Sequence, residues 1–188
     1  SFFASVLFLS LLEQLKKHWT AIGISLALLG LIRPQDLLFG MLLVPHLSLR
    51  TIPRIMIGFL VAFLPQMYLW YLFYGSWWAN PYIAEGLGFN FLSPHLVGVL
   101  FSPNNGLFLW TPILLLATIG LFRLAARNHK RALWIFLVVA AWYLIASWSV
   151  WSLGGSYSGR MFISLLPIFA FGLAEMFAWI STRKFLAR

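Results

Sequence analysis

Seven apolar stretches make up most of the chain, and most of them are separated by short turns. They cover 2–12, 19–32, 36–49, 55–74, 107–122, 132–150 and 161–182. A helix on the surface of a soluble domain carries its apolar residues on one face, whereas long and uniformly apolar stretches are typical of helices that cross a bilayer. The pattern therefore predicts an all-α, polytopic integral membrane helix bundle of about seven helical segments, the first of which is truncated.

The composition supports this class and excludes several kinds of site. Hydrophobic residues make up 62% of the chain and charged residues 9%, whereas a soluble domain is about half apolar and about a quarter charged. Cysteine is absent, which excludes disulfides, thiolate catalysis and cysteine-based metal sites for this chain. The histidines do not have the spacing of metal ligands, so we predict no metal site among His18, His46, His95 and His129.

The N-terminus lies inside the first apolar stretch. Ser1, Phe2 and Phe3 are not preceded by the basic segment of a signal peptide, and no small-residue cleavage site follows them. We therefore expect 1–188 to be a single transmembrane domain and a fragment of a longer chain.

The basic residues are distributed unevenly between alternate turns. One set of turns holds eleven of the thirteen basic residues and the other set holds Arg33 and Arg160. The positive-inside rule makes the richer side cytoplasmic. Because these residues are spread among short turns rather than gathered on one polar face, we do not expect a nucleic-acid partner. The cytoplasmic set comprises Lys16, Lys17, Arg50, Arg54, Arg123, Arg127, Lys130, Arg131, Arg183, Lys184 and Arg188.

The turn over 75–106 is much longer than the others and is predicted to be external. A loop of this length is usually functional or disordered, and its aromatic and apolar composition argues against disorder. Its first part carries Trp77, Trp78 and Tyr82. Such rings favour the headgroup level of a bilayer, so they are interfacial residues or line the path of a lipid.

The second part of this loop predicts a short interfacial helix near 93–101. Ser93 is the expected N-cap and Pro94 the first helical residue, and a Ser-Pro-Asn-Asn-Gly turn follows. A helix lying on the outer surface would place His95 and Leu100 beside a lipid path. The alternative is that the helix merely seals the bundle.

Two charges surround a proline in the segment "LIRPQDLLFG". The flanking apolar stretches of about 14 residues span about 21 Å as α-helices, less than the hydrocarbon core of about 30 Å. Arg33 and Asp36, on either side of Pro34, are therefore expected below the outer membrane surface, where they need protein or a water-filled cavity. They form an ion pair within the turn, or hold an anionic substrate, or the segment boundary is misplaced.

The segment "WSLGGSYSGRMF" places one arginine behind three glycines. Gly154, Gly155 and Gly159 leave nearby backbone N–H groups free of side chains, which suits a phosphate, and Arg160 adds a fixed positive charge. The alternative is an interfacial arginine that extends toward the headgroups beside a flexible turn.

The chain has four acidic residues. Asp36 and Glu85 are external and are the candidates for a catalytic general base, although a lone carboxylate is a weak signal of that role. Glu13 and Glu175 lie toward the cytoplasmic side, where we expect ion pairs with basic neighbours such as Lys16, Lys17 or Arg183.

Four segments together resemble a known family. "LLGLIRPQDLLF", "FLPQMYLWYLFYGSWWANPY", "LFSPNNGLFLWTPILLLATIGL" and "WSLGGSYSGRMFISLLPIFAFGLA" follow in the order seen in the later membrane portion of bacterial family 39-like glycosyltransferases. The chain thus resembles the protein mannosyltransferase-related enzymes of the GT-C fold over nearly all of its length.

The resemblance implies an enzyme of the bacterial cytoplasmic (inner) membrane. Such an enzyme transfers a sugar from a polyprenyl-phosphate donor to an acceptor, here unknown, on the external face. The catalytic acidic residue of this family lies in an early external loop, so the chain is expected to carry the residues that bind the lipid donor without the principal base. No cofactor is identified, and a divalent metal in the full-length protein is left open. The alternatives are a transporter or flippase of lipid-linked saccharides, and a non-catalytic membrane scaffold.

Overall fold

The computed structural model describes residues 1–14, 18–79, 86–128, 131–152 and 159–186. Within these ranges all regular structure is helical, with one isolated bridge between Phe89 and Trp148. The all-α prediction is therefore confirmed for the described residues, and each of the seven apolar stretches is helical over most of its described length. The chain forms two compact units, unit 1 from Ser1 to Gly88 and unit 2 from Phe89 to Arg188.

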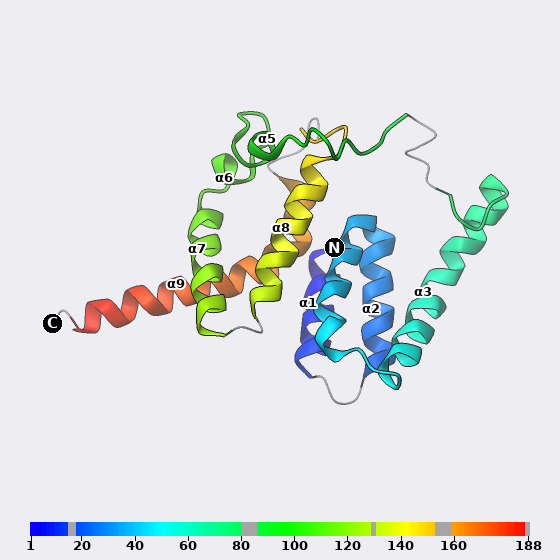
Figure 1. The fold of residues 1–188 in the computed structure, drawn as a ribbon, viewed down its shortest axis with the longest axis horizontal. Helices are drawn as coiled ribbons and strands as arrows, with labels where there is room; N and C mark the ends of the chain where they lie inside the picture. Colours follow the sequence, from blue (N-terminus) through cyan, green and yellow to red (C-terminus); the bar gives the residue numbers. More distant parts are fainter. Residues whose placement is uncertain (15–17, 80–85, 129–130, 153–158, 187–188) are drawn as a thin grey trace. The chain divides into compact units, whose positions relative to one another are not determined.

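The described residues of unit 1 form four helical elements, and α2 contacts each of the other three. α2 packs against α1 and η1 and most extensively against α3, as Figure 1 shows. The elements are α1 (Phe2–Glu13), α2 (Trp19–Ile32), the 3₁₀ helix η1 (Pro34–His46) and α3 (Thr51–Tyr74).

The backbones of α2 and α3 touch at two glycines. A Cβ atom at Gly23 would collide with the carbonyl oxygen of Ile55, and one at Gly58 would collide with the carbonyl oxygen of Thr20. Small residues allow such close approach between helices in a bilayer. Glycine is thus required at both positions by the contact itself.

The expected α-helix over 36–49 is instead a 3₁₀ helix. It begins at Pro34, ends at His46 and contains Pro45. Proline has no backbone N–H, so it cannot donate a helical hydrogen bond at position 45. A 3₁₀ helix rises about 2.0 Å per residue, so the 13 residues of η1 span about 26 Å rather than the expected 21 Å.

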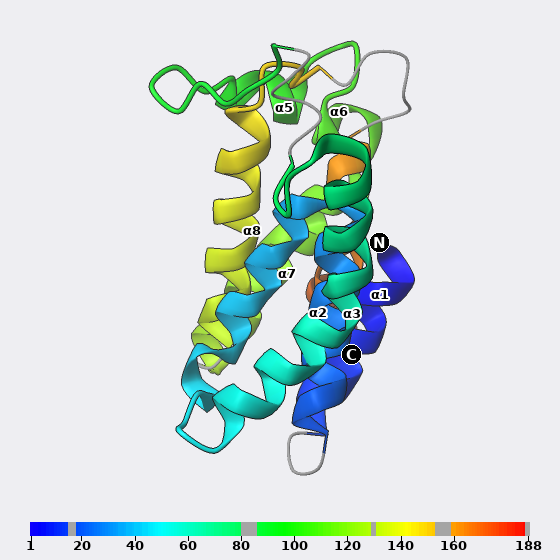
Figure 2. The ribbon, with the colours of Figure 1, turned by 90° about the vertical axis from the view of Figure 1, so that its right-hand side faces the viewer.

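Unit 2 is built on α7, which packs against both α9 and α8. Figure 2 shows α7 and α8 from a second side. A Cβ atom at Gly120 would collide with the carbonyl oxygen of Gly172, and one at Gly172 would collide with that of Ala117. The α7–α9 pair is therefore also a backbone contact. The elements are α5 (Leu96–Phe101), α6 (Leu107–Trp110), α7 (Ile113–Arg127), α8 (Ala132–Ala146), the 3₁₀ helix η3 (Arg160–Leu165) and α9 (Leu166–Leu186).

Three expected boundaries in unit 2 were wrong. The stretch 107–122 is divided at Pro112, which lies between α6 and α7, because proline favours a helix start and not a helix interior. α7 then continues to Arg127, and α8 ends at Ala146 and not at 150. The predicted stretch 161–182 is helical throughout, first as η3 and then as α9.

The long loop divides between the two units, and its second part is held against the C-terminal end of α8. The His95 N–H donates to the Ala146 carbonyl oxygen at 2.8 Å. The Tyr143 hydroxyl donates to the Phe91 carbonyl oxygen at 2.7 Å. These bonds make the segment that carries α5 an ordered cap on α8.

The predicted start of the interfacial helix was wrong. α5 begins at Leu96 with His95 at the N-cap position, so Ser93 is not its N-cap and Pro94 is not its first residue. The Ser93 hydroxyl instead accepts a hydrogen bond from Asn90 Nδ2 at 2.6 Å. This side-chain bond stabilises the turn that precedes α5.

Among the described residues, two helices are long and apolar enough to cross a membrane, Thr51–Tyr74 and Arg160–Thr182, the second of which combines η3 with most of α9. α3 is the more exposed of the two. Arg54 is its one charged residue, and most of its exposed side chains are large and apolar. They include Met56, Ile57, Val61, Leu64, Leu72 and Phe73.

Candidate functional site

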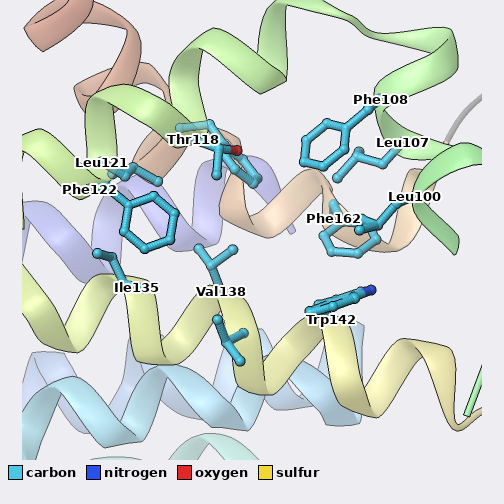
Figure 3. A pocket seen from close by; sticks show the side chains of 12 residues that line it. Leu100, Leu107, Phe108, Thr118, Leu121, Phe122, Ile135, Val138, Trp142 and Phe162 are labelled. Atoms are coloured by element: carbon cyan, nitrogen blue, oxygen red, sulfur yellow. The ribbon is translucent and has the colours of Figure 1, made fainter. Parts of the chain in front are cut away.

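Unit 2 contains an apolar cavity of about 210 Å³ between α7 and α8. Figure 3 shows side chains of α7 and α8 converging on it from two sides, with residues of α5, α6 and η3 at one end. The cavity is lined by Leu100, Leu107, Phe108, Thr118, Leu121, Phe122, Ile135, Val138, Val139, Trp142, Phe162 and Phe169.

The polar hydrogens of the lining are already used within the protein. The Thr118 hydroxyl donates to the Leu114 carbonyl oxygen at 2.7 Å. The Trp142 indole Nε1–H donates to the Leu96 carbonyl oxygen at 3.0 Å, which also fixes α5 on α8. Since a saccharide needs polar partners, this cavity suits a hydrocarbon.

The size of the cavity limits what it can hold. An engineered apolar cavity of about 150 Å³ stays dry and binds benzene, whereas sites for drug-sized ligands measure about 300–1,000 Å³. A volume of about 210 Å³ therefore accommodates part of a hydrocarbon chain.

The cavity extends from the interior of unit 2 to its surface. Leu121 and Phe169 are 3% and 2% exposed, whereas Phe122 and Val139 are 55% and 44% exposed. The last two belong to α7 and α8 respectively. A chain can thus enter sideways between these two helices without crossing a polar surface.

Gly159 lies against the α6 end of the cavity. A Cβ atom there would be 3.2 Å from Leu107 Cδ1 and 3.1 Å from Phe162 Cδ2, which is tighter than an ordinary contact. Gly159 is buried, so its absent side chain serves this packing. Arg160 follows it directly, begins η3 and is exposed. The structure therefore places a cationic residue next in sequence to the wall of an apolar cavity.

The charged residues on either side of Pro34 belong to unit 1. Arg33 follows α2 in an extended conformation, and the Asp36 N–H donates to the Arg33 carbonyl oxygen at 2.9 Å. The Asp36 residue is 3% exposed in the first turn of η1, so the segment around Pro34 is a tight turn with a buried carboxyl. The ion pair and the substrate role both stay predictions. Four residues of the predicted site, Tyr82, Glu85, Gly154 and Gly155, lie outside the described residues.

The two predicted tryptophans fold back onto the end of α3. The Trp77 ring stacks on Tyr71 with centroids 4.8 Å apart, and Trp78 meets Trp70 edge to face at 5.7 Å. Trp77 and Trp78 are exposed. They form an aromatic cluster at the end of a long apolar helix, as rings at a bilayer interface do.

Of the two residues predicted to lie beside a lipid path, Leu100 lies at the cavity and His95 lies on the surface. Leu100 lines the cavity, so α5 contributes to the site that the sequence had associated with a lipid. His95 is exposed and stacks on Trp151 at 4.7 Å. The deeper wall was not predicted from the sequence, because Leu121, Phe162 and Phe169 look like any other apolar residues of this chain.

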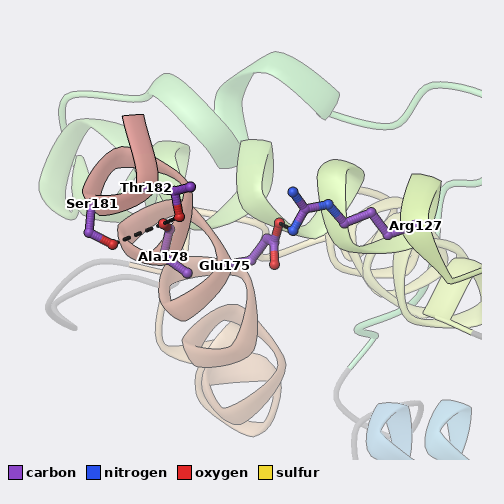
Figure 4. Close-up of polar contacts among 5 residues, drawn as sticks. All are labelled: Arg127, Glu175, Ala178, Ser181 and Thr182. Carbon is purple, nitrogen blue, oxygen red and sulfur yellow. Dashed lines mark hydrogen bonds and ion pairs between the residues drawn. The ribbon is translucent and has the colours of Figure 1, made fainter. Parts of the chain in front are cut away.

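Glu175 meets a basic residue of the cytoplasmic set, as expected. Its carboxylate forms an ion pair with Arg127, at 2.6 Å between Oε1 and Nη1 (Figure 4). Lys16, Lys17 and the Arg183 side chain lie outside the part of the chain that the structure describes. The two residues meet because α7 packs against α9, a contact that the sequence did not indicate.

The chain matches no protein-family model, no curated protein and no solved structure. The resemblance to family 39-like glycosyltransferases therefore depends on the four quoted segments alone.

Proposed function

We propose that this chain is the lipid-binding portion of a membrane glycosyltransferase of the GT-C type. The enzyme takes a sugar from a polyprenyl-phosphate donor and transfers it to an acceptor on the external face of the bacterial cytoplasmic membrane. The polyprenyl chain occupies the cavity between α7 and α8, and Arg160 holds the phosphate. Arg33 is the second cationic residue on the external side.

One observation carries this proposal: the lining of the cavity is apolar and ends beside Gly159 and Arg160. A polyprenyl phosphate has the same two parts, a hydrocarbon chain without polar groups and a dianionic head. Guanidinium donates to phosphate oxygens in a planar fork, and it stabilises charge that develops on a leaving phosphate most strongly where water is excluded.

The membrane setting of the proposal rests on α3, α9 and the distribution of charge. Two helices in the part of the chain that the structure describes are long and apolar enough to cross a bilayer, and the exposed side chains of α3 are mostly hydrocarbon. The remaining helical segments complete a polytopic bundle of about seven segments in this proposal. Residues 123–131, which include the last turn of α7, then face the cytoplasm, and α5 faces outside.

Binding of polyprenyl phosphate to the full-length protein tests the assignment of Arg160. Arg160→Ala removes charge-assisted hydrogen bonds, which contribute about 1.5–3 kcal/mol, so its affinity should fall about tenfold or more. The affinity of Arg160→Lys should lie between those of the wild type and Arg160→Ala. Native mass spectrometry measures the affinity.

Polyprenol, which has the chain without the phosphate, is the matched ligand control. Its affinity should be the same for the wild type and Arg160→Ala, and Arg54→Ala in unit 1 should bind both ligands normally. Equal loss of polyprenol and polyprenyl phosphate would show that Arg160 is structural and would contradict the proposal.

Cysteine labelling tests the topology. A full-length protein whose other cysteines are removed should label at Asn104→Cys in intact cells with an impermeant reagent. Asn128→Cys should label after the membrane is opened. Both positions are exposed, so accessibility within the fold is matched, and the reverse pattern would contradict the proposed orientation.

A transport function predicts a different product. Reconstituted transferase releases polyprenyl phosphate from a polyprenyl-phosphate hexose when an acceptor is present. A flippase moves the intact donor across the vesicle without release, so analysis of the lipid product separates the two functions.

A further inference from the structure

The segment 89–101, which carries α5, is bound to the C-terminal half of α8. The Asn90 N–H donates to the Ser147 carbonyl oxygen at 2.6 Å. The Trp142 indole N–H donates to the Leu96 carbonyl oxygen at 3.0 Å. Since both a backbone bond and a side-chain bond join this segment to the same helix, it follows α8 in any movement of that helix.

The residues that follow α8 also hold α5. A Cβ atom at Gly98 would lie 2.7 Å from Trp151 Cζ3, so α5 rests directly on this ring. The Trp151 ring also stacks on His95, with centroids 4.7 Å apart. We call α8 together with the segments 89–101 and 147–151 the α8 body.

The N-terminal end of α8 packs on α9. Trp134 is buried, and its ring meets Phe171 edge to face with centroids 5.0 Å apart. Further along α8, the side chains of Ile135, Val138 and Trp142 line the cavity. Within the described part of the chain, no hydrogen bond joins α8 to α7 or to α9. The α8 body is therefore anchored at one end and loosely packed along the cavity.

In a bilayer, the α7–α8 contact is the easier of the two contacts of α7 to open. The facing side chains, such as Phe122 of α7 and Val138 of α8, are hydrocarbon, and lipid tails are as apolar as they are. Parting α7 from α8 thus costs packing contacts without a hydrophobic penalty. Parting α7 from α9 would break the close backbone contact at Gly120 and Gly172.

α5 lies in the path of a lipid headgroup. Figure 3 shows residues of α5, α6 and η3 at the same end of the cavity, and η3 begins at Arg160. A dianionic head cannot pass through an apolar gap, so it stays at the level of Arg160 while its chain enters between α7 and α8. Leu100 of α5 lines this end, so entry requires α5 to move aside.

We infer that the α8 body is a lateral gate, which pivots at the contact between Trp134 and Phe171 and closes on a hydrocarbon chain in the cavity. The gate rests on the proposed function for its membrane setting and for the identity of the chain, and it adds how the chain enters. Hinged closure around a ligand commonly moves a rigid element about a few terminal residues. Here the hinge lies at the end of α8 that is remote from α5.

Pulsed electron paramagnetic resonance on the full-length protein in nanodiscs tests the movement. Spin labels on Val97→Cys of α5 and Leu116→Cys of α7 report across the gap, with other cysteines removed. Added polyprenol should narrow their distance distribution, because a bound chain contacts both helices. Both positions are exposed, so the labels lie outside the cavity.

Two control pairs separate the gate from a general change of the protein. Val97→Cys with Val150→Cys lies within the α8 body, and Leu116→Cys with Phe177→Cys joins α7 to α9; all four positions are exposed. Polyprenol should leave both distributions unchanged. An unchanged distribution for Val97 and Leu116 would overturn the gate, and so would an equal change within the α8 body.

Trp142→Phe tests the bond that couples α5 to α8. It keeps a ring at the cavity and removes the donor to the Leu96 carbonyl oxygen, so polyprenol should dissociate about fivefold faster, as expected for one lost hydrogen bond. Trp110→Phe is the matched control, because it removes an indole bond to the Pro103 carbonyl oxygen and does not involve α8. An equal dissociation rate in both variants, with unchanged circular dichroism spectra, would contradict the coupling.

The gate and the proposed function can fail separately. If polyprenyl phosphate binds in an Arg160-dependent manner while the distribution for Val97 and Leu116 stays unchanged, the gate fails and the proposed function remains. If polyprenol narrows that distribution but polyprenyl phosphate binds no more tightly than polyprenol, the assignment of the phosphate fails and the gate remains.

Discussion

Units 1 and 2 each contain a pair of helices whose backbones touch at glycines, and unit 2 also has a looser helix contact. In unit 1 the α2–α3 contact depends on Gly23 and Gly58, and in unit 2 the α7–α9 contact depends on Gly120 and Gly172. Unit 2 adds α8, which meets α7 through large side chains, including Phe122 of α7 and Ile135 of α8.

This difference explains why the cavity lies between α7 and α8. Backbones in contact leave no space between two helices, whereas bulky side chains hold them apart and fill the gap incompletely. Phe122 is more than half exposed, so the gap is open at its side. In the proposed function, the tight helix contacts therefore serve assembly and the loose contact serves binding.

Adding one methyl group at the tight contacts should have the largest effect. Gly120→Ala and Gly58→Ala each force two helices apart, so each should lose about 2 kcal/mol or more of stability, as overpacked contacts do. Unfolding of the full-length protein in sodium dodecyl sulfate, followed by circular dichroism, measures the loss.

Gly40→Ala in η1 is the control for these variants. A Cβ atom there would lie 3.5 Å from Leu26 Cδ2, an ordinary contact. Stability of Gly120→Ala equal to that of Gly40→Ala would show that the α7–α9 contact is not tight.

Filling the loose contact should affect binding more than folding. Val138→Phe reduces the cavity, and we expect the dissociation constant of polyprenol to rise about fivefold, which corresponds to ~1 kcal/mol. Val61→Phe on the exposed face of α3 is the control, because it adds the same volume outside the cavity. An unchanged affinity of Val138→Phe for polyprenol would mean that the chain lies elsewhere.

Removing one hydrogen bond from the cap should have the smallest effect. Tyr143→Phe deletes the bond to the Phe91 carbonyl oxygen, which contributes about 1 kcal/mol. Amides of 89–95 should exchange with deuterium about fivefold faster, while Tyr68→Phe on α3 leaves them unchanged. The same exchange rate in wild type and Tyr143→Phe would show that the cap is held by its other bonds.

Sequence reasoning predicted the elements better than their ends. The apolar stretches predicted the helices, because an uninterrupted apolar stretch of this length has few other ways to satisfy its backbone. The break at Pro112 and the 3₁₀ winding of η1 were missed, although proline was a visible signal at both places.

The candidate site was predicted in part. The sequence singled out Leu100 and Gly159 because helix signals, turns and glycines are unusual in a chain of this composition, and both now lie at the cavity. It did not predict Phe162 or Phe169, because the type of an apolar residue does not indicate which helix its side chain will contact.

The sequence by itself determined the helical class of this protein and the uneven distribution of its arginines, because both follow from local composition. The tertiary structure alone decided that Arg127 meets Glu175 and that α7 and α8 leave a cavity between them. These contacts join residues far apart in the chain, and they exist because glycines set how closely α7 and α9 approach while large side chains keep α8 further away.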